Sequence, residues 1–148
     1  MKKIILISCS ATKLDYACKA EEMYSSALFK LSMKYAKTLN PTSIFILSAK
    51  YGLVPPAQII EPYNVTLTKG KAKSGTIVLN KSDIVEWSKN VMNSLARCSD
   101  LEKDSFVFLA GKDYVEPLLN RNAIQNYCLP LLGLRIGKRL NFLKQKIN

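Results

Sequence analysis

Short runs of consecutive apolar residues, each followed by small polar residues, are the strongest pattern in this chain. Residues 4–7 and 44–47 form such runs, and the segment 105–110 contains a third one after Ser105. A run of this length is typical of a strand that is buried on both faces, as the strands of a parallel sheet are. The pattern therefore predicts three central strands.

Segments with apolar residues at helical spacing lie between and after these runs. The first two of these segments start with serine or aspartate, which cap helix N-termini by accepting hydrogen bonds from free backbone N–H groups. The first of these helices ends before Pro41, because proline cannot continue a helix. The predicted helices begin near Ser25-Ser26, at Ser82-Asp83, at Val115 and at about Arg135.

The alternation of strands and helices sets the expected architecture. A strand, a helix and a second strand form a unit whose two strands are parallel. We therefore predict that residues 1–148 form a single α/β domain, with three layers and a small, mainly parallel sheet. Residues 53–80 show neither period and contain several prolines, so we expect irregular structure there. Residues 127–133 are expected to form a loop or a short edge strand.

Polar turns follow all three predicted strands. In an open α/β sheet, ligands bind in the crevice beyond the carboxyl ends of the strands, so residues in these turns are expected to share one pocket. They are Cys9, Ser10 and Lys13 after the first strand, Ser48, Lys50, Tyr51 and Gly52 after the second, and Gly111, Lys112 and Tyr114 after the third.

Cys9 and the lysines are the main candidates for catalysis. Cys9 is a candidate nucleophile with Lys13 as a neighbouring cation, and the alternative is a small thiol that fills the end of the strand. Lys13, Lys50 and Lys112 are candidates for holding a phosphate or carboxylate, and Lys13 also for an amine nucleophile. The alternative for each lysine is an ordinary surface charge.

The irregular stretch supplies the remaining candidates. Glu61 is a candidate acid or base, with an ordinary exposed glutamate as the alternative. Tyr51 and Tyr63 flank the proline-rich segment and are candidates for stacking on a nucleobase. Their alternative role is to pack that segment onto the sheet.

The composition excludes several kinds of chemistry. The chain has no histidine, which rules out Ser-His-Asp and Cys-His catalysis and histidine metal sites. Its four cysteines lie far apart with no Cys-x-x-Cys pair, so we expect reduced thiols, no metal site and no cofactor. No apolar stretch approaches the length of a bilayer span or of a signal peptide core. We therefore expect a cytoplasmic protein without a membrane partner.

The charge balance favours a polyanionic partner. Lysine and arginine number 22 against 11 aspartates and glutamates, a formal net charge of +11. Nucleic acid or a nucleotide is the expected partner, and a lysine-rich solvated surface is the alternative. The last helix is predicted to pack Ile136 and Leu143 inward and to turn its cations outward. The expected phosphate-contacting residues are Lys69, Lys71, Lys73, Arg135, Lys138 and Arg139.

Several of these motifs resemble an uncharacterised bacterial and phage domain family. They are the Cys-Ser-x-x-Lys turn at Cys9, the Tyr-x-Ser-x-x-Phe segment at Tyr24, and the Leu-Ser-Ala-Lys-x-Gly-Leu segment at Leu47, followed by Pro62-Tyr63. More distantly, the order of these motifs is similar to the core domain of archaeosine synthase, which attaches lysine to a deazaguanine base in transfer RNA. That core is related in fold to uracil-DNA glycosylases.

The resemblance implies a base-recognising pocket in a uracil-DNA-glycosylase-like or flavodoxin-like fold. It also adds Ser25 to the candidate substrate-binding residues. The leading hypothesis is an enzyme directed at a nucleobase or nucleoside, acting by base modification or at the N-glycosidic bond. The alternative is a non-catalytic nucleic-acid or nucleotide-binding module in a phage-defence or mobile-element setting. A third hypothesis is a scaffold with a lysine-rich surface.

Overall fold

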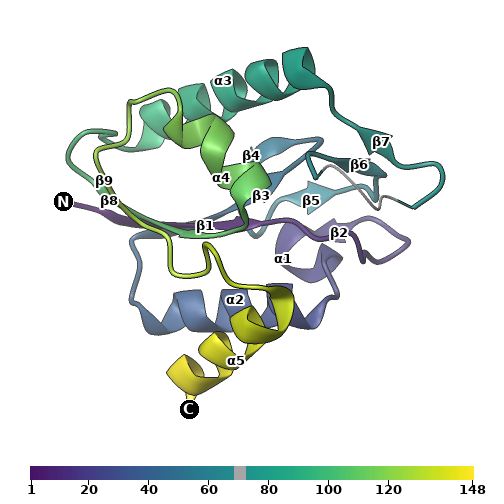
Figure 1. Cartoon of the computed structure of the whole chain (residues 1–148), viewed down its shortest axis with the longest axis horizontal. Coiled ribbons are helices and arrows are strands. Elements are labelled where there is room, and N and C mark those ends of the chain that lie inside the picture. Colours follow the sequence, from purple (N-terminus) through teal and green to yellow (C-terminus); the bar gives the residue numbers. More distant parts are fainter. Residues whose placement is uncertain (69–72) are drawn as a thin grey trace.

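A five-stranded sheet forms the centre of the computed structural model, which describes residues 1–68 and 73–148. The strand order is β4-β3-β1-β8-β9, and all neighbours are parallel except β4, which runs antiparallel to β3. The strands are β1 (Lys3–Ser8), β3 (Ser43–Ser48), β4 (Gly52–Val54), β8 (Ser105–Leu109) and β9 (Asn126–Cys128) (Figure 1).

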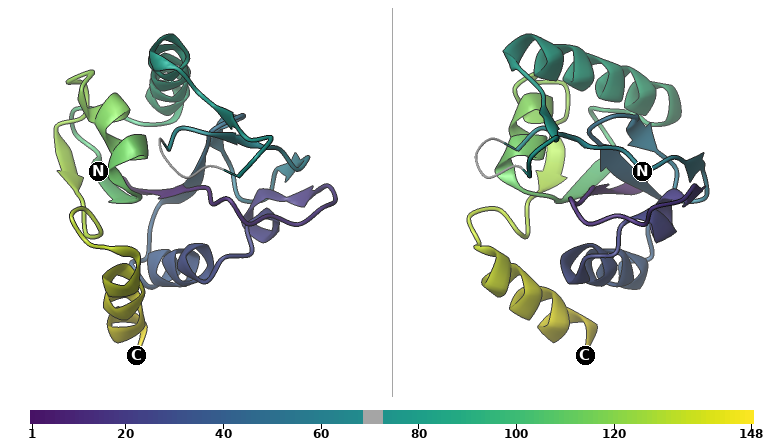
Figure 2. Two further views of the ribbon diagram at one scale, coloured as in Figure 1. Left: turned by 45° about the vertical axis from the view of Figure 1, so that its right-hand side comes forward. Right: turned by 90° about the vertical axis from the view of Figure 1, so that its right-hand side faces the viewer.

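Helices cover both faces of this sheet. α2 (Ala27–Thr38) and α5 (Ile136–Ile147) lie on one face, and α3 (Lys81–Cys98) and α4 (Lys112–Leu119) lie on the other (Figure 2). This arrangement confirms the predicted three-layer α/β architecture with a mainly parallel sheet. Taken in chain order, the parallel strands lie second-first-third-fourth, which is the order of the first four strands of a flavodoxin-like sheet.

The first strand is the centre of the core. Ile5 lies opposite Ile44 of β3 on one side and opposite Val107 of β8 on the other. The side chains of residues 4–7 are at most 1% exposed. A strand that is buried on both faces and paired along both edges explains the uninterrupted apolar run in the sequence.

The N-caps of α2 and α3 can be compared directly with their predicted positions. Ser26 caps α2 by accepting a hydrogen bond from the Phe29 backbone N–H at 3.2 Å, as predicted. The predicted cap of α3 at Ser82-Asp83 was wrong by two positions. Asn80 is the N-cap, and its side chain and that of Asp83 form reciprocal hydrogen bonds with the backbone at the start of the helix.

The last helix differs from its prediction in its first turn. Leu143 is buried as expected, but Ile136 is 66% exposed. Residues 135–138 are all exposed, so no other element covers the start of α5. Helical spacing therefore gave the correct face of the helix but not the length over which that face is covered.

The described parts of the segment 53–80, residues 53–68 and 73–80, are less irregular than predicted. They contribute β4, β5 (Ile59–Ile60), β6 (Val65–Thr66) and β7 (Ile77–Val78). β5 pairs with β2 (Cys18–Lys19), which is followed by the short helix α1 (Ala20–Met23), and β6 pairs with β7. These small sheets lie beyond the carboxyl end of β1 (Figure 1). Pairs of two residues give too short a pattern for detection in a sequence.

The helices in the described ranges are all too short or too polar to span a bilayer.

Asp104 links the starts of β1 and β8. Its carboxylate accepts hydrogen bonds from the backbone N–H groups of Lys2 and Asp100, both at 2.8 Å. These two bonds hold the pKa of Asp104 below its ordinary value of 3.8. The ionised carboxylate therefore stabilises the folded state at neutral pH.

We predict that Asp104→Asn lowers the free energy of unfolding at neutral pH. Because the pKa is depressed in the folded state, wild-type stability falls as the pH drops below 3.8 and through the folded-state value, so the gap between the two proteins narrows there. Urea unfolding from pH 7 to pH 2 measures this. Asp15→Asn at an exposed site is the control, and a gap that stays constant with pH would contradict the prediction.

Candidate active site

The carboxyl ends of β1 and β8 form the switch point of the sheet. From β1 the chain continues through α2 to β3 on one side, and from β8 it continues through α4 to β9 on the other. The two helices lie on opposite faces, so the connections leave in opposite directions and a crevice opens between the strand ends. Cys9 follows β1 directly, and Tyr114 lies in the first turn of α4.

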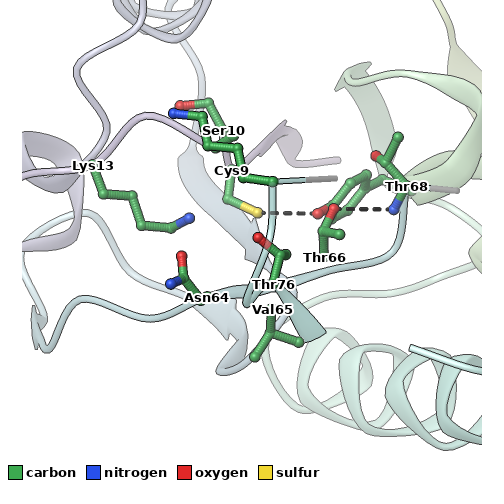
Figure 3. Close-up of a pocket in the computed structure, with 11 residues that line it drawn as sticks. Cys9, Ser10, Lys13, Asn64, Val65, Thr66, Thr68 and Thr76 are labelled. Carbon is green, nitrogen blue, oxygen red and sulfur yellow. Dashed lines mark hydrogen bonds between the residues drawn. The ribbon is translucent and has the colours of Figure 1, made fainter. Parts of the chain in front are cut away.

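A cavity of about 370 Å³ lies at this crevice. Its volume is at the lower end of the range of about 300–1,000 Å³ that is usual for small-molecule sites. Its walls come from the turn after β1, from the segment around β6 and β7, and from α4 (Figure 3). The lining residues are Cys9, Ser10, Ala11, Lys13, Asn64, Val65, Thr66, Thr68, Lys73, Thr76 and Tyr114.

The Cys9 thiol is held at the floor of the cavity. The Cys9 backbone N–H donates to the Leu47 carbonyl at 2.9 Å, which extends the pairing of β1 and β3 by one residue. Its Sγ lies 3.3 Å from the Tyr114 hydroxyl. Burial raises the pKa of Tyr114, and the neighbouring Cys9 raises it further. The hydroxyl therefore stays protonated and is able to donate a hydrogen bond to the sulfur.

Lys13 supplies a cation to the same cavity. The chain around it pairs with the segment before α2, because Leu14 N–H donates to Met23 O and Ser25 N–H donates to Thr12 O. The Lys13 side chain extends toward Cys9 and Thr76 (Figure 3). Burial lowers the pKa of Lys13, and the nearby Cys9 opposes that shift. Ser25 thus braces the Lys13 turn and does not line the cavity.

The Lys13 ammonium group packs over two tyrosine rings. Its Nζ lies 4.5 Å from the centroid of the Tyr63 ring and 5.9 Å from that of Tyr24. The Tyr24 and Tyr63 hydroxyls are hydrogen-bonded at 2.5 Å, and Ser48 Oγ donates to Tyr63 at 2.8 Å. Burial raises the pKa of both tyrosines, so they remain neutral. Ser48 and Tyr63 therefore form a rigid base beneath the site, and Tyr63 packs its segment onto the sheet.

The other predicted residues of the second turn lie outside the cavity lining. Lys50 is exposed, with its Nζ 5.2 Å from the centroid of the Tyr51 ring. Tyr51 packs edge-on against Tyr63 and bonds the backbone of Glu61, whose side chain is exposed. Gly52 has φ 76°, a conformation that favours glycine, and it allows the turn from β3 to β4.

The third turn divides in the same way. Tyr114 lines the cavity, whereas Lys112 is exposed and forms an ion pair with Glu116 at 3.8 Å on the surface of α4. Gly111 is the N-cap of α4. Trp87 packs edge-on against the Tyr114 ring, with centroids 5.8 Å apart, and its indole N–H donates to the Ser48 carbonyl at 2.8 Å.

The predicted phosphate-contacting residues fall into three groups. Lys73 lines the cavity, and Lys69 and Lys71 lie outside the described residues. Arg135 and Lys138 are exposed on α5. Arg139 is half-buried and turned toward the sheet, where its Nε donates to the Leu134 carbonyl at 2.8 Å.

Sequence reasoning missed the wall formed by Asn64, Thr66, Thr68 and Thr76. The available signal was their position, because a long segment without a clear period inside a compact domain is usually functional. These residues give the cavity an amide and several hydroxyls, and its described lining includes no carboxylate. The cavity therefore favours an electron-rich or anionic ligand. Within residues 1–68 and 73–148, no group of three or more acidic or cysteine side chains is placed to hold a metal ion.

Fold and site together define an α/β protein with a cysteine- and lysine-containing pocket at its switch point. The chain belongs to the family of unknown function DUF6884, which matches residues 4–145. This confirms the expected membership of an uncharacterised domain family. Neither the curated proteins nor the solved structures gave a match. The resemblance to archaeosine synthase and to uracil-DNA glycosylases thus stays a prediction.

We predict that Lys13 loses its proton at a lower pH than exposed lysines do. Burial disfavours the ammonium, so the folded-state pKa lies below the ordinary value of 10.5. The ¹³Cε and ¹⁵Nζ chemical shifts of Lys13 measured against pH report this, with exposed Lys30 as the reference. Since Cys9 raises the pKa, Cys9→Ala should move the Lys13 midpoint lower still. Equal midpoints for Lys13 and Lys30 would contradict the burial of the amine.

Proposed function

We propose that this protein is an enzyme that acts on a nucleobase or nucleoside, free or within nucleic acid, by modifying the base or reacting at its N-glycosidic bond. One observation carries the proposal. A thiol (Cys9), a phenol (Tyr114) and an amine (Lys13) from separate parts of the chain meet in one cavity at the switch point. Nucleophile, donor and cation are the components that covalent catalysis requires.

Each residue has a distinct role in this proposal. Cys9 is the nucleophile, and the Tyr114 hydroxyl orients its sulfur at 3.3 Å. Lys13 stabilises negative charge that develops on the base or the leaving group, in a partly buried site where electrostatic interactions are stronger than in water. Asn64 and Thr76 supply an amide and a hydroxyl for the hydrogen-bonding edge of a base.

Charge and resemblance support a nucleobase over other substrates of similar size. The net charge is +11, and both titratable cations of the cavity lining, Lys13 and Lys73, are unpaired with acids in the described part of the chain. The likeness of the motifs to the archaeosine synthase core favours a base-recognising pocket. The cysteines are free, which fits a reducing compartment, and we place the enzyme in the cytoplasm.

We predict that Cys9→Ala and Lys13→Ala abolish turnover and change substrate affinity little. The assay incubates the protein with cellular RNA, DNA and free nucleosides, then digests the polymers and compares nucleoside masses. Cys98→Ala and Lys30→Ala, at exposed positions far from the cavity lining, are matched controls that should retain full activity. Turnover that survives in Cys9→Ala would remove the thiol from the mechanism and overturn the proposal.

A second candidate function, a non-catalytic nucleic-acid-binding module, is favoured by the surface of α5. Arg135, Lys138, Lys144 and Lys146 are exposed there, and residues 136–147 contain no aspartate or glutamate. Such a surface suits a phosphate backbone. This function needs no cysteine, so it is separated from the first by the Cys9→Ala result.

If α5 contacts nucleic acid, replacing Arg135 and Lys138 with glutamine should weaken binding and flatten its salt dependence. The slope of log K against log salt should fall by roughly one for each phosphate contact removed. Fluorescence anisotropy with a labelled oligonucleotide between 50 and about 200 mM salt measures this. Lys89→Gln with Lys103→Gln removes the same charge from other exposed positions, and an equal effect from that pair would indicate non-specific attraction.

A further inference from the structure

Arg139 is held against the backbone at the start of α4. A Cβ atom added to Gly111 would lie 3.2 Å from Arg139 Nη1 and 3.3 Å from Nη2. The absence of a side chain at Gly111 therefore lets the guanidinium lie directly on the N-cap of this helix. Its Nε bond to Leu134 O fixes the direction of the side chain and leaves both Nη groups facing the strand ends.

The charge of this arginine is not compensated within the described ranges. No carboxylate there lies within ion-pair distance of Arg139, and its Nη groups donate to no described residue. The N-terminus of a helix carries partial positive charge, which favours the exposed Asp113 in the first turn of α4 and disfavours a cation beside its N-cap. An anion bound between the helix start and the guanidinium would reverse the sign of that interaction.

A small hollow with both polar and apolar lining residues lies next to the guanidinium. It is about 30 Å³, room for a water-sized group, and its lining includes Arg139, Ser26 and Ser32. Ser32 is only 2% exposed, and its hydroxyl makes no hydrogen bond to another described residue. In the described part of the chain, every side-chain oxygen or nitrogen that is fully buried has a hydrogen-bond partner. The Ser32 hydroxyl has none, so it is not fully buried and opens into the hollow that Ser32 lines. Ser26, the N-cap of α2, brings the start of a second helix to the same place.

Cys9 and Ser10 separate this hollow from the larger cavity, because they line both. We infer that the substrate carries a phosphate, which Arg139 binds between the starts of α4 and α2 while the base occupies the larger cavity. One phosphate oxygen enters the hollow toward Ser32, and the guanidinium donates to the others. This inference rests on the proposed function and narrows its substrate from a nucleoside to a nucleotide, either free or within a polymer.

The test is a titration with inorganic phosphate, followed through backbone amide shifts in ¹H–¹⁵N NMR spectra. Saturable shifts are expected at Ser10, Ser26 and Gly111. Arg139→Gln should weaken binding by about tenfold or more, because a charged hydrogen-bond partner is lost. Gly111→Ala keeps the charge and an unstrained backbone but displaces the guanidinium, and it should weaken binding as well. Arg97→Gln, exposed on α3, is the control with the same charge change.

Unchanged phosphate binding in Arg139→Gln, or shifts spread over the lysine surface, would overturn the inference. The phosphate could belong to a free nucleotide or to a nucleic-acid backbone. Titrations with adenosine 5′-monophosphate and with an oligonucleotide without terminal phosphates distinguish these two sources, because only the ligand that fits should show Arg139-dependent binding. Neither showing it would also overturn the inference. The outcome is independent of the proposed enzyme activity, because binding of inorganic phosphate is measured without any turnover. Turnover without Arg139-dependent phosphate binding would overturn only the inference of a phosphate site. Arg139-dependent phosphate binding without turnover would overturn only the proposed enzymatic function.

Discussion

The pairing of β1 along both of its edges is the constraint on which the site depends. With β3 on one side, β8 on the other and helices over both faces, residues 4–7 of the strand have no free surface. Its carboxyl end opens to solvent, and there the chain turns through Cys9 and Ser10. Because β1 and β8 continue in opposite directions, their ends stay uncovered by their own connections. The other walls are then added by residues 64–66, 68, 73 and 76 and by Tyr114.

Two partly buried cations flank the Cys9–Ser10 turn without acidic partners in the described part of the chain. Lys13 faces the larger cavity and rests on tyrosine rings, and Arg139 faces the smaller hollow and rests on a glycine backbone. Removing a cation partly from water without pairing it lowers stability, and a bound anion would offset that cost. A substrate with an electron-rich base and a phosphate would use both, one on each side of the thiol.

The strands, helices and layers were predictable because their signals are local. An apolar run of four residues identifies β1 without any knowledge of the rest of the fold. Cys9, Lys13 and Tyr114 could be found because each lies shortly after the end of a predicted strand. The directions of side chains in turns were not predictable. Lys50 and Lys112 follow strands equally closely but point to solvent, since the geometry of each turn decides where a side chain goes.

Features that depend on tertiary contacts were missed because no local sequence signal identifies them. The polar wall of Thr66 and Thr76 comes from two-residue strands that exist only because they pair with each other. Arg139 reads as one more outward cation of a basic helix. Its inward direction depends on the missing side chain of Gly111, twenty-eight positions earlier in the chain.

The packing of Trp87 has a practical consequence. It is the single tryptophan of the chain, it is buried, and its ring meets that of Tyr114, whose hydroxyl contacts the Cys9 sulfur. Its indole N–H is bonded to Ser48, the residue that also supports Tyr63. Trp87 is thus an intrinsic fluorophore that is connected to the Cys9 thiol through one intervening side chain, that of Tyr114. We therefore expect its intrinsic fluorescence to change when a ligand fills the pocket, without any added label.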